Sequence, residues 1–326
     1  MNISKIAALA GVSSTTVSRF LNNGYVSQEN REKIQKIIDE TGYIPSAQAQ
    51  TLRTKKTNLI GVILPKISSE TVSRIVEGIS VELTKEGYNI LLGNTDLNIQ
   101  KEIEYLNIFK NNQVDGIIFI ATIVTPKHLE VMEKIKVPIV VVGQEIEGYS
   151  CVYHDDYGAA YDLTHTFIEK GCKHIAYIGV TQKDKAVGME RRRGYEEALK
   201  KSDLEIDTEI ICEGEFSSES GYQNMKKILD TGKVIDGVFC ATDNIAVGAM
   251  DYLKESQQDL ESIYVAGIGD SKFSKVITPK LTSMHYYYKT SGLTAGRMIL
   301  EAVKENKKII KKVKLGFELQ KRQSLC

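Results

Sequence analysis

The sequence predicts an N-terminal all-α helix-turn-helix unit followed by an α/β core with two lobes and parallel sheets. Within residues 1–42, three short stretches carry apolar side chains at helical spacing. From residue 58 onward, short apolar runs alternate with amphipathic stretches, which is typical of parallel strands covered by helices on both faces. An internal repeat in this second part indicates two similar lobes.

The three expected helices of the first unit have clear ends. Asn2 is a favourable cap for the first helix, and Gly11 supplies the permissive backbone where that helix stops. Ser13 caps the second helix, whereas Ser27 opens a third helix that ends near Gly42. The inward faces are apolar and comprise Ile3, Ile6, Ala7, Ala10, Val17, Leu21, Ile34, Ile37 and Ile38. Three helices with a tight turn between the first two make a helix-turn-helix.

The outward face of the second helix is small, polar and basic. In a major groove, short hydroxyl side chains contact base edges or phosphates, and an arginine binds guanine through two hydrogen bonds. Arg19, Ser14 and Thr15 are therefore expected to read bases. In an isolated helix these residues would more often be an ordinary solvated surface, so the prediction depends on the surrounding motif. The side chains of this unit expected to contact DNA are Ser14, Thr15, Thr16, Ser18, Arg19, Asn22 and Tyr43.

The second part of the chain supplies the strands of the predicted core. The expected strands are residues 59–64, 88–93, 116–121, 139–143, 174–179, 238–241 and 264–267. The internal repeat lies in residues 114–119 and 235–240, which read VDGIIF and IDGVFC. Ligands of open parallel sheets bind outside the carboxyl ends of the strands, so two facing lobes would enclose a cleft lined by strand-end loops.

Composition narrows the class of protein. The longest apolar runs, residues 117–121 and 139–142, are far shorter than the ~18 residues that span a bilayer, so no membrane segment is expected. Residues 1–10 lack the pattern of a secretory signal, and the five scattered cysteines favour neither a disulfide framework nor a zinc site. These features indicate a cytoplasmic protein. No cofactor and no metal ion are expected.

The charges are distributed unevenly along the chain. The formal net charge is zero, but residues 1–57 carry eight Lys and Arg against four Asp and Glu. A basic first unit on a mildly acidic core is expected of a protein whose first unit alone touches phosphates.

A longer motif surrounds the second helix. Residues 6–22, which read IAALAGVSSTTVSRFLN, resemble the signature of the LacI/GalR family of bacterial repressors. The resemblance continues through residues 26–27, 31–34 and 42–45, and it covers essentially the whole chain to Arg322. It implies a core like that of type I periplasmic binding proteins. The implied domains are a DNA-binding domain at 1–45, a hinge helix or linker at 46–57, and an effector-binding and dimerisation domain at 58–326, with lobes at about 58–157 with 288–312 and about 158–287 with 313–326.

The resemblance also gives the hinge a role. Isolated helices below about 12 residues are marginal in water, so residues 46–54 should become ordered only with help. In the resembled family, a helix at this position pairs with its twin across the dimer and inserts a leucine into the minor groove. Leu52 occupies that place here, and Arg53 is then either a phosphate contact or only a solubilising charge. A plain linker with one incidental leucine is the alternative.

The core contains candidate contacts for a sugar. A sugar requires planar hydrogen-bonding groups for its hydroxyls and an aromatic ring for its C–H face. The resemblance points to Arg191, in an Arg-x-x-Gly-aromatic element, and to Phe216 as the aromatic side chain. Alternatively, Asp156 and Asp243 could cap the helices that follow them, Arg191 could be solvated, and Phe216 could be core. The full candidate set is Ser69, Thr71, Asp156, Arg191, Phe216, Thr242, Asp243 and Tyr286.

One position departs from the family pattern. Many sugar-binding members carry Gly-aromatic-Asp-Asp at the penultimate strand end, whereas residues 267–270 here read GIGD. Glycine replaces the first acidic residue, so a carboxylate that binds sugar hydroxyls is absent there. The chain resembles sucrose operon repressors at this position and in residues 94–97, 143–145 and 184–188. The resemblance therefore implies sucrose, a fructose unit or another saccharide as the effector.

These features together indicate a DNA-binding transcriptional repressor of carbohydrate-utilisation genes that is released from double-stranded operator DNA by a small sugar. A homodimer, or a higher oligomer, would present two heads to two half-sites. The alternatives are a sugar-binding transport receptor and a sugar-modifying enzyme with an α/β core. A receptor should carry a signal peptide and no basic head. An enzyme lacks support, because neither a complete dinucleotide motif nor a P-loop nor a Gly-x-Ser-x-Gly motif occurs.

Overall fold

The computed structural model describes residues 1–22, 24–43, 56–111, 114–256, 262–305 and 310–325. The chain divides into two compact units, Met1–Leu59 and Ile60–Cys326, each with its own hydrophobic core. No helix in the described part of the chain combines the length and apolar character needed to span a bilayer.

The first two helices of the first unit have the predicted caps. Helix α1 (Ile3–Ala10) begins after Asn2, whose side chain accepts a hydrogen bond from the backbone N–H of the third helical residue. It ends at Gly11, where a φ of 65° favours glycine. Helix α2 (Ser14–Leu21) begins after Ser13, whose hydroxyl accepts a backbone N–H from the first turn. The expected start and end of α1 and the expected start of α2 are confirmed.

The third helix completes the core of this unit. Helix α3 (Gln28–Thr41) ends at Gly42, which also has a left-handed φ of 60°. The core side chains come from all three helices and the residue after Gly42, and are Ile6, Ala7, Ala10, Val17, Ile34 and Tyr43. A helix-turn-helix unit is therefore present.

The second unit contains two six-stranded sheets, as the internal repeat predicts. The first sheet has the strand order β11-β5-β4-β3-β1-β2 and the second has the order β12-β10-β9-β8-β6-β7. Within the pairs whose register is defined, neighbouring strands run parallel except β12, which is antiparallel to β10. The first lobe holds β1 (Leu59–Leu64), β2 (Asn89–Asn94), β3 (Gly116–Ile120), β4 (Ile139–Val142), β5 (Ser150–His154) and β11 (Lys312–Leu315). The second lobe holds β6 (Ile175–Val180), β7 (Ile211–Gly214), β8 (Gly237–Cys240), β9 (Tyr264–Ile268), β10 (Thr282–Tyr286) and β12 (Phe317–Gln320).

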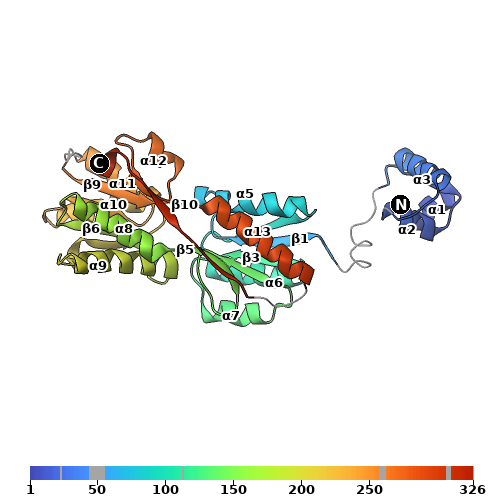
Figure 1. Cartoon of the computed structure of the whole chain (residues 1–326), viewed down its shortest axis with the longest axis horizontal. Coiled ribbons are helices and arrows are strands. Elements are labelled where there is room, and N and C mark those ends of the chain that lie inside the picture. The colour runs from blue at the N-terminus through green and yellow to red at the C-terminus, as the bar shows by residue number, and fades with distance from the viewer. Residues whose placement is uncertain (23, 44–55, 112–113, 257–261, 306–309, 326) are drawn as a thin grey trace. The chain divides into compact units, whose positions relative to one another are not determined.

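Helices cover the sheets of both lobes (Figure 1). Those of the first lobe are α5 (Glu70–Lys85), α6 (Ile99–Asn111), α7 (Pro126–Glu133) and α13 (Tyr288–Glu305). Those of the second lobe are α8 (Asp156–Glu169), a π-helix (Lys185–Glu190), α9 (Arg191–Lys201), α10 (Ser218–Asp230), α11 (Asp243–Glu255), α12 (Lys272–Val276) and short 3-10 turns at Thr208–Ile210 and Gln323–Leu325. Helices α5 and α13 pack closely because Gly78 and Gly292 face each other's backbone, where a Cβ would lie about 2 Å from a carbonyl oxygen.

Three chain passages connect the lobes, and they determine where the site forms. The chain leaves the first sheet after His154, returns after Tyr286 and leaves again after Leu315. Leu315 still pairs with His154, so the last passage lies at Gly316 rather than at the expected residue 313. Strands β5 and β10 both end at these passages, so the ends of both strands lie where the chain crosses between the two lobes (Figure 1).

Strand β2 differs from the expectation that both faces of every strand are covered. It is an edge strand of the first sheet, and Leu91 and Leu92 are 39% and 41% exposed.

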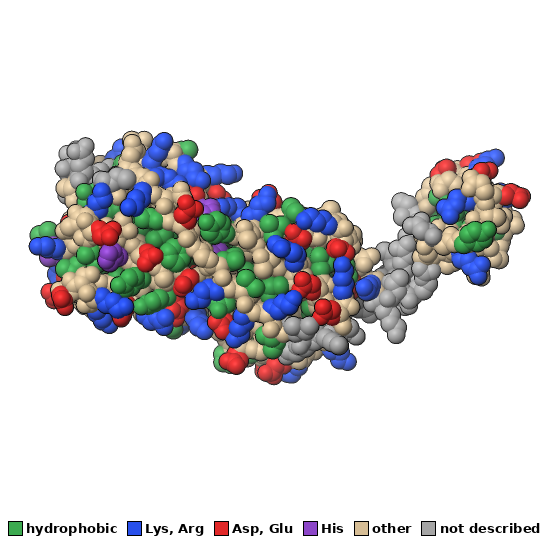
Figure 2. All heavy atoms as spheres, viewed as in Figure 1, with side chains coloured by type: hydrophobic (Ala, Val, Ile, Leu, Met, Phe, Trp, Pro, Cys, Tyr) green, Lys and Arg blue, Asp and Glu red, His purple; other side chains and the backbone are tan. Residues whose placement is uncertain are grey.

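The face of the second unit that is visible in Figure 2 carries basic and acidic side chains mixed over both lobes.

Candidate functional site

The outward face of α2 has the exposure expected of a surface that contacts DNA. Four of its predicted contacts, Ser14, Thr15, Arg19 and Asn22, are exposed, and Thr16 and Ser18 are half-buried. The face also carries internal bonds, since the hydroxyls of Ser13 and Thr16 lie 2.8 Å apart and Asn22 donates to the Ser18 carbonyl. The basic side chain of this helix, Arg19, is exposed on this face.

The other predicted DNA contacts lie elsewhere in the chain. Tyr43 is 8% exposed and packs in the core of the helical unit, so its ring supports the helices. Leu52 and Arg53 lie outside the described residues.

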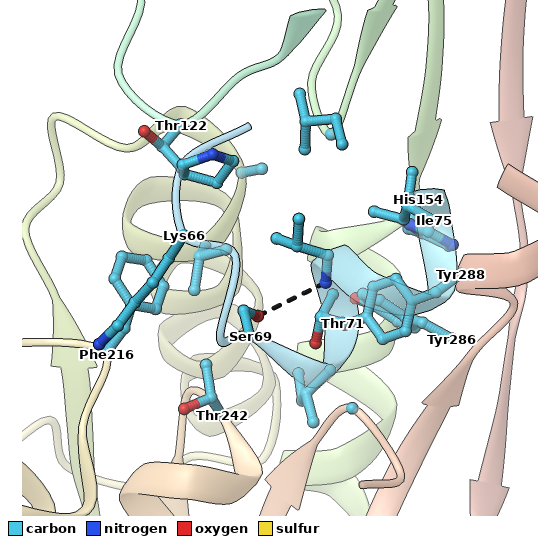
Figure 3. Close-up of a pocket in the computed structure, with 18 of the residues that line it drawn as sticks. Lys66, Ser69, Thr71, Ile75, Thr122, His154, Phe216, Thr242, Tyr286 and Tyr288 are labelled. Atoms are coloured by element: carbon cyan, nitrogen blue, oxygen red, sulfur yellow. Dashed lines mark hydrogen bonds between the residues drawn. The ribbon is translucent and has the colours of Figure 1, made fainter. Parts of the chain in front are cut away.

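A cavity of about 200 Å³ lies between the two lobes of the second unit. Loops after the carboxyl ends of β1, β3, β4, β6, β7, β8 and β9 line it, together with the last residues of β5 and β10. This is the place where open parallel sheets bind ligands. All eight candidate effector contacts line this cavity: Ser69, Thr71, Asp156, Arg191, Phe216, Thr242, Asp243 and Tyr286. In Figure 3, Thr71, Tyr286 and His154 gather on one side, while Lys66 and Phe216 lie on the other.

A buried ion pair forms the most strongly polar part of the wall. The Nε atom of Arg191 donates to Oδ1 of Asp156 at 2.7 Å, and the hydroxyl of Tyr286 donates to the same oxygen at 3.1 Å. Arg191 also donates to the Ala241 carbonyl and lies over the Tyr286 ring. Burial alone would lower the pKa of Arg191, but the Asp156 carboxylate outweighs it and raises that pKa. The guanidinium is therefore a permanent, oriented donor.

For three candidates, the structure argues against the simpler explanation that the sequence left open. Helix α8 is capped by Asp155, whose carboxylate accepts from Gly158 N at 3.2 Å, so Asp156 is not needed as the cap. Likewise, Thr242 caps α11, and Asp243 is not the cap. Arg191 is 4% exposed and is not a solvated surface residue.

Some candidates also have structural roles. Asp243 accepts from the Ser283 hydroxyl and from Ser271 N, both at 2.6 Å, so it holds β10 and the loop before α12 together. Burial raises the pKa of Asp243. The hydroxyls of Ser69 and Thr242 accept backbone N–H groups as helix caps, which leaves their O–H groups as donors. Phe216 packs at the edge of the core and also lines the cavity.

The cavity residues that the sequence analysis missed include His154, Tyr288 and Asp184. His154 is 7% exposed and stacks on Tyr286, with 4.5 Å between ring centroids, and its Nε2 atom has no hydrogen-bond partner among the described residues. Burial, reinforced by Arg191, lowers the pKa of His154 to about 3. Tyr288 begins α13 on the returning passage. Burial raises the pKa of Asp184 to about 6, although this residue also caps the π-helix.

The glycine that departs from the family pattern lies at the cavity. Gly269 lines it, whereas the next residue, Asp270, does not. Asp270 instead accepts from Arg322 Nη2 at 2.5 Å and from His285 Nδ1 at 2.9 Å, and lies 3.2 Å from Lys275 Nζ. Burial opposes ionisation of Asp270, but these three partners hold its pKa below the usual value. The carboxylate at this strand end therefore stabilises the second lobe.

Among the residues that the structure describes, no group of three or more His, Cys, Asp or Glu side chains is placed to hold a metal ion. The polar groups of the cavity can hold and orient a ligand through hydrogen bonds.

Comparisons with known proteins agree with this description. Residues 2–46 match the family model "Bacterial regulatory proteins, lacI family", and residues 164–325 match a periplasmic binding protein-like domain. The sucrose operon repressor of Staphylococcus xylosus is 35% identical over 321 residues, covering 97% of this chain and 99% of the relative. Catabolite control protein A of Priestia megaterium is 33% identical, covering 99% of each chain.

Solved structures share the fold of both units. A transcriptional regulator CelR–cellobiose complex superimposes with a TM-score of 0.77 at 26% identity, covering 99% of each chain. The lac repressor dimer bound to operator and the anti-inducer ONPF gives a TM-score of 0.91 at 23% identity, covering 100% of this chain and 99% of that one. The chain therefore belongs to the lacI family of bacterial regulatory proteins, and it is a DNA-binding transcriptional regulator rather than an enzyme.

Proposed function

We propose that this regulator is a cytoplasmic repressor of carbohydrate-utilisation genes whose affinity for operator DNA is lowered by a neutral saccharide bound between the lobes. The observation that carries the proposal is the buried cluster of Arg191, Asp156 and Tyr286 in the interlobe cavity. Both bonds to Asp156 end on Oδ1, which leaves Oδ2 to accept from a sugar hydroxyl. Planar, charged hydrogen-bonding groups with an aromatic ring nearby suit vicinal hydroxyls and the C–H face of a sugar.

The effector we propose is sucrose, its fructose unit or a related saccharide. The relative that is 35% identical is a sucrose operon repressor, and the CelR structure contains cellobiose. The contacts proposed for the effector are Ser69, Thr71, Asp156, Arg191, Phe216, Thr242, Asp243 and Tyr286.

For DNA recognition we propose a homodimer, with the two helical units on successive half-sites. The contacts proposed on each half-site are Ser14, Thr15, Thr16, Ser18, Arg19, Asn22 and Tyr43, with Leu52 and Arg53 from the hinge. The proposed domains are residues 1–45 for DNA, 46–57 as hinge, and 58–326 for effector binding and dimerisation. Saccharide binding would change the angle between the lobes, and thereby the spacing of the hinges, by a coupling of typically about 1 to 3 kcal/mol.

The test is a titration of the full-length protein on a labelled duplex selected from a random library for tight binding. Fluorescence anisotropy is followed while sucrose, fructose, glucose, cellobiose or trehalose is added. The proposal expects at least one saccharide to lower the affinity of the protein for the selected duplex about 5- to 150-fold. Equal binding to scrambled DNA, or no response to any of the five sugars, contradicts it.

A further inference from the structure

A second cavity adjoins the interlobe cavity. It has a volume of about 310 Å³ and lies between the loop after β4, the end of β5 and the π-helix–α9 segment of the second lobe. The two cavities share four lining residues, Gly143, His154, Asp156 and Ala186. Asp156, whose carboxylate is proposed to hold the effector, is therefore part of the wall of both cavities. With the second cavity included, the space lies within the range of about 300 to 1,000 Å³ typical of small-molecule sites.

An unsatisfied buried atom lies at this junction. His154 lines both cavities, and its Nε2 has no hydrogen-bond partner among the described residues although the side chain is more than nine-tenths buried. Leaving a buried polar atom without a partner costs about 1 to 3 kcal/mol. Stacking on Tyr286 fixes the imidazole ring where the linings of the two cavities meet.

The lining of the second cavity indicates an uncharged occupant. Its lining has four acidic and three basic side chains, and ion pairs use most of these charges: Arg193 with Glu190 at 2.8 Å, Lys314 with Asp155 at 3.4 Å, and Glu145 with Lys312, which lies outside the lining, at 2.6 Å. A phosphate or carboxylate would require a surplus of positive charge. Polar side chains whose charges are already paired can instead donate and accept hydrogen bonds with the hydroxyl groups of a neutral ligand.

The cavity also offers an aromatic surface. Tyr157 is half-buried in its wall, and the guanidinium of Arg193 lies 4.6 Å from the Tyr157 ring centre. The contact with Arg193 holds the Tyr157 ring in place in the cavity wall. Aromatic rings that are fixed in this way pack against apolar C–H patches with little loss of conformational entropy.

We propose that the second cavity holds the second ring of a neutral two-ring saccharide whose first ring lies against Arg191 and Asp156. His154 bonds the saccharide at the junction, and Tyr157 packs against the second ring. This inference rests on the proposed function and specifies its ligand: the effector is an intact disaccharide rather than a single sugar or a sugar phosphate.

The test measures affinities of the full-length protein by isothermal titration calorimetry. The two-ring probes are sucrose, cellobiose and trehalose, the one-ring probes are fructose and glucose, and sucrose 6-phosphate is the charged probe. The wild type is expected to bind one two-ring sugar at least about tenfold more tightly than either single ring. Tyr157→Ala should weaken that two-ring sugar about five- to tenfold and change one-ring binding less than about twofold.

The chain supplies a matched control. Tyr161 lies one turn further along α8 and carries Lys201 over its ring as Tyr157 carries Arg193, but it does not line the cavity. Tyr161→Ala should therefore leave all affinities unchanged. If Tyr157→Ala fails to fold, Lys185→Ala in the cavity wall is compared with Lys183→Ala outside it, with an expected loss of about threefold for the two-ring sugar only.

The outcomes separate this inference from the proposed function. If no saccharide binds the wild type, the proposed function fails and the inference fails with it. If a single ring binds as tightly as every disaccharide, if Tyr157→Ala weakens both classes equally, or if sucrose 6-phosphate binds more tightly than sucrose, the inference is overturned while saccharide control survives.

Discussion

The rings of His154 and Tyr286 lie nearly parallel, with 4.5 Å between their centroids and 7° between their planes. One residue ends the strand at which the chain leaves the first lobe, and the other ends the strand at which it returns. The stacked pair therefore joins two of the three passages between the lobes at the wall of the interlobe cavity. Under the proposed function, an effector that contacts either ring would act on the segments that connect the lobes.

Replacing His154 tests whether its unsatisfied nitrogen contacts the effector. His154→Phe keeps an aromatic ring against Tyr286 but removes Nε2, so saccharide affinity should fall about five- to tenfold, as expected for one lost hydrogen bond. The free energy of unfolding should stay the same or rise by about 1 kcal/mol, because a buried polar atom without a partner is removed. Calorimetry and urea unfolding measure the two effects. The same substitution at His165, which is exposed on α8, is the control, and unchanged sugar affinity in His154→Phe removes this residue from the site.

Replacing Arg191 should separate the sugar response from repression. Arg191→Ala should abolish release of operator DNA by saccharide while leaving sugar-free DNA binding intact. It should also lower stability by about 3 to 5 kcal/mol, because the buried carboxylate of Asp156 loses its partner. Arg192→Ala, next in sequence but partly exposed and paired with Glu196, is the control.

A double variant distinguishes loss of the response from loss of folding. Arg191→Met combined with Asp156→Asn removes both charges, so most of the stability should return while the response remains absent. A normal saccharide response in either variant contradicts the assignment of the ion pair to the effector site.

Replacing Arg19 tests base reading by α2. Arg19→Ala should cost about 1 to 3 kcal/mol on the selected duplex and relax base preference, with a smaller effect on random DNA. Lys36→Ala, on the exposed face of α3, is the control for a general loss of positive charge. Competition binding against base-substituted duplexes provides the measurement. An equal loss on selected and random DNA shows that Arg19 contacts only the backbone.

Asp184 predicts a specific dependence of stability on pH. Burial raises the pKa of Asp184 to about 6 from its ordinary value of 3.8, so the folded state favours the protonated acid. The stability that it contributes is fully present below pH 3.8 and is lost as pH rises through about 6, which amounts to about 3 kcal/mol. Asp184→Asn should therefore gain about 2 to 3 kcal/mol relative to the wild type between pH 4 and pH 7.5, measured by urea unfolding. A pH-independent difference between the two proteins refutes this assignment.

Features fixed by local chemistry were predictable from the sequence. In the helical unit, the structure confirmed helix starts at the capping residues Asn2 and Ser13. It also confirmed helix ends at the glycines that follow α1 and α3. The apolar strand runs were confirmed to within about a residue at each end, because burial on both faces leaves a continuous apolar signal. The eight candidate effector contacts line one cavity because strand-end loops converge wherever parallel sheets face each other.

Features fixed by distant parts of the chain were not predictable. Strand β10 contains buried Thr282 and Ser283, whose hydroxyls donate to the Arg322 carbonyl and to Asp243, and these bonds make polar residues acceptable inside a sheet. The edge strands β7, β11 and β12 are four residues long and partly polar, so no apolar run marks them. His154 lines the cavity because β5 ends at a passage between the lobes. The sequence pattern does not show where the chain crosses from one lobe to the other, so this residue could not be predicted.

The central claim is that saccharide in the interlobe cavity and operator DNA on the helical units oppose each other through one conformational equilibrium. Linkage requires the coupling to be reciprocal, so the factor by which saccharide weakens operator binding must equal the factor by which operator weakens saccharide binding. The direct measurement is saccharide affinity of the full-length protein with and without saturating selected duplex. The account predicts a decrease of about 5- to 150-fold that matches the change in operator affinity. Equal saccharide affinity in the two conditions would contradict it.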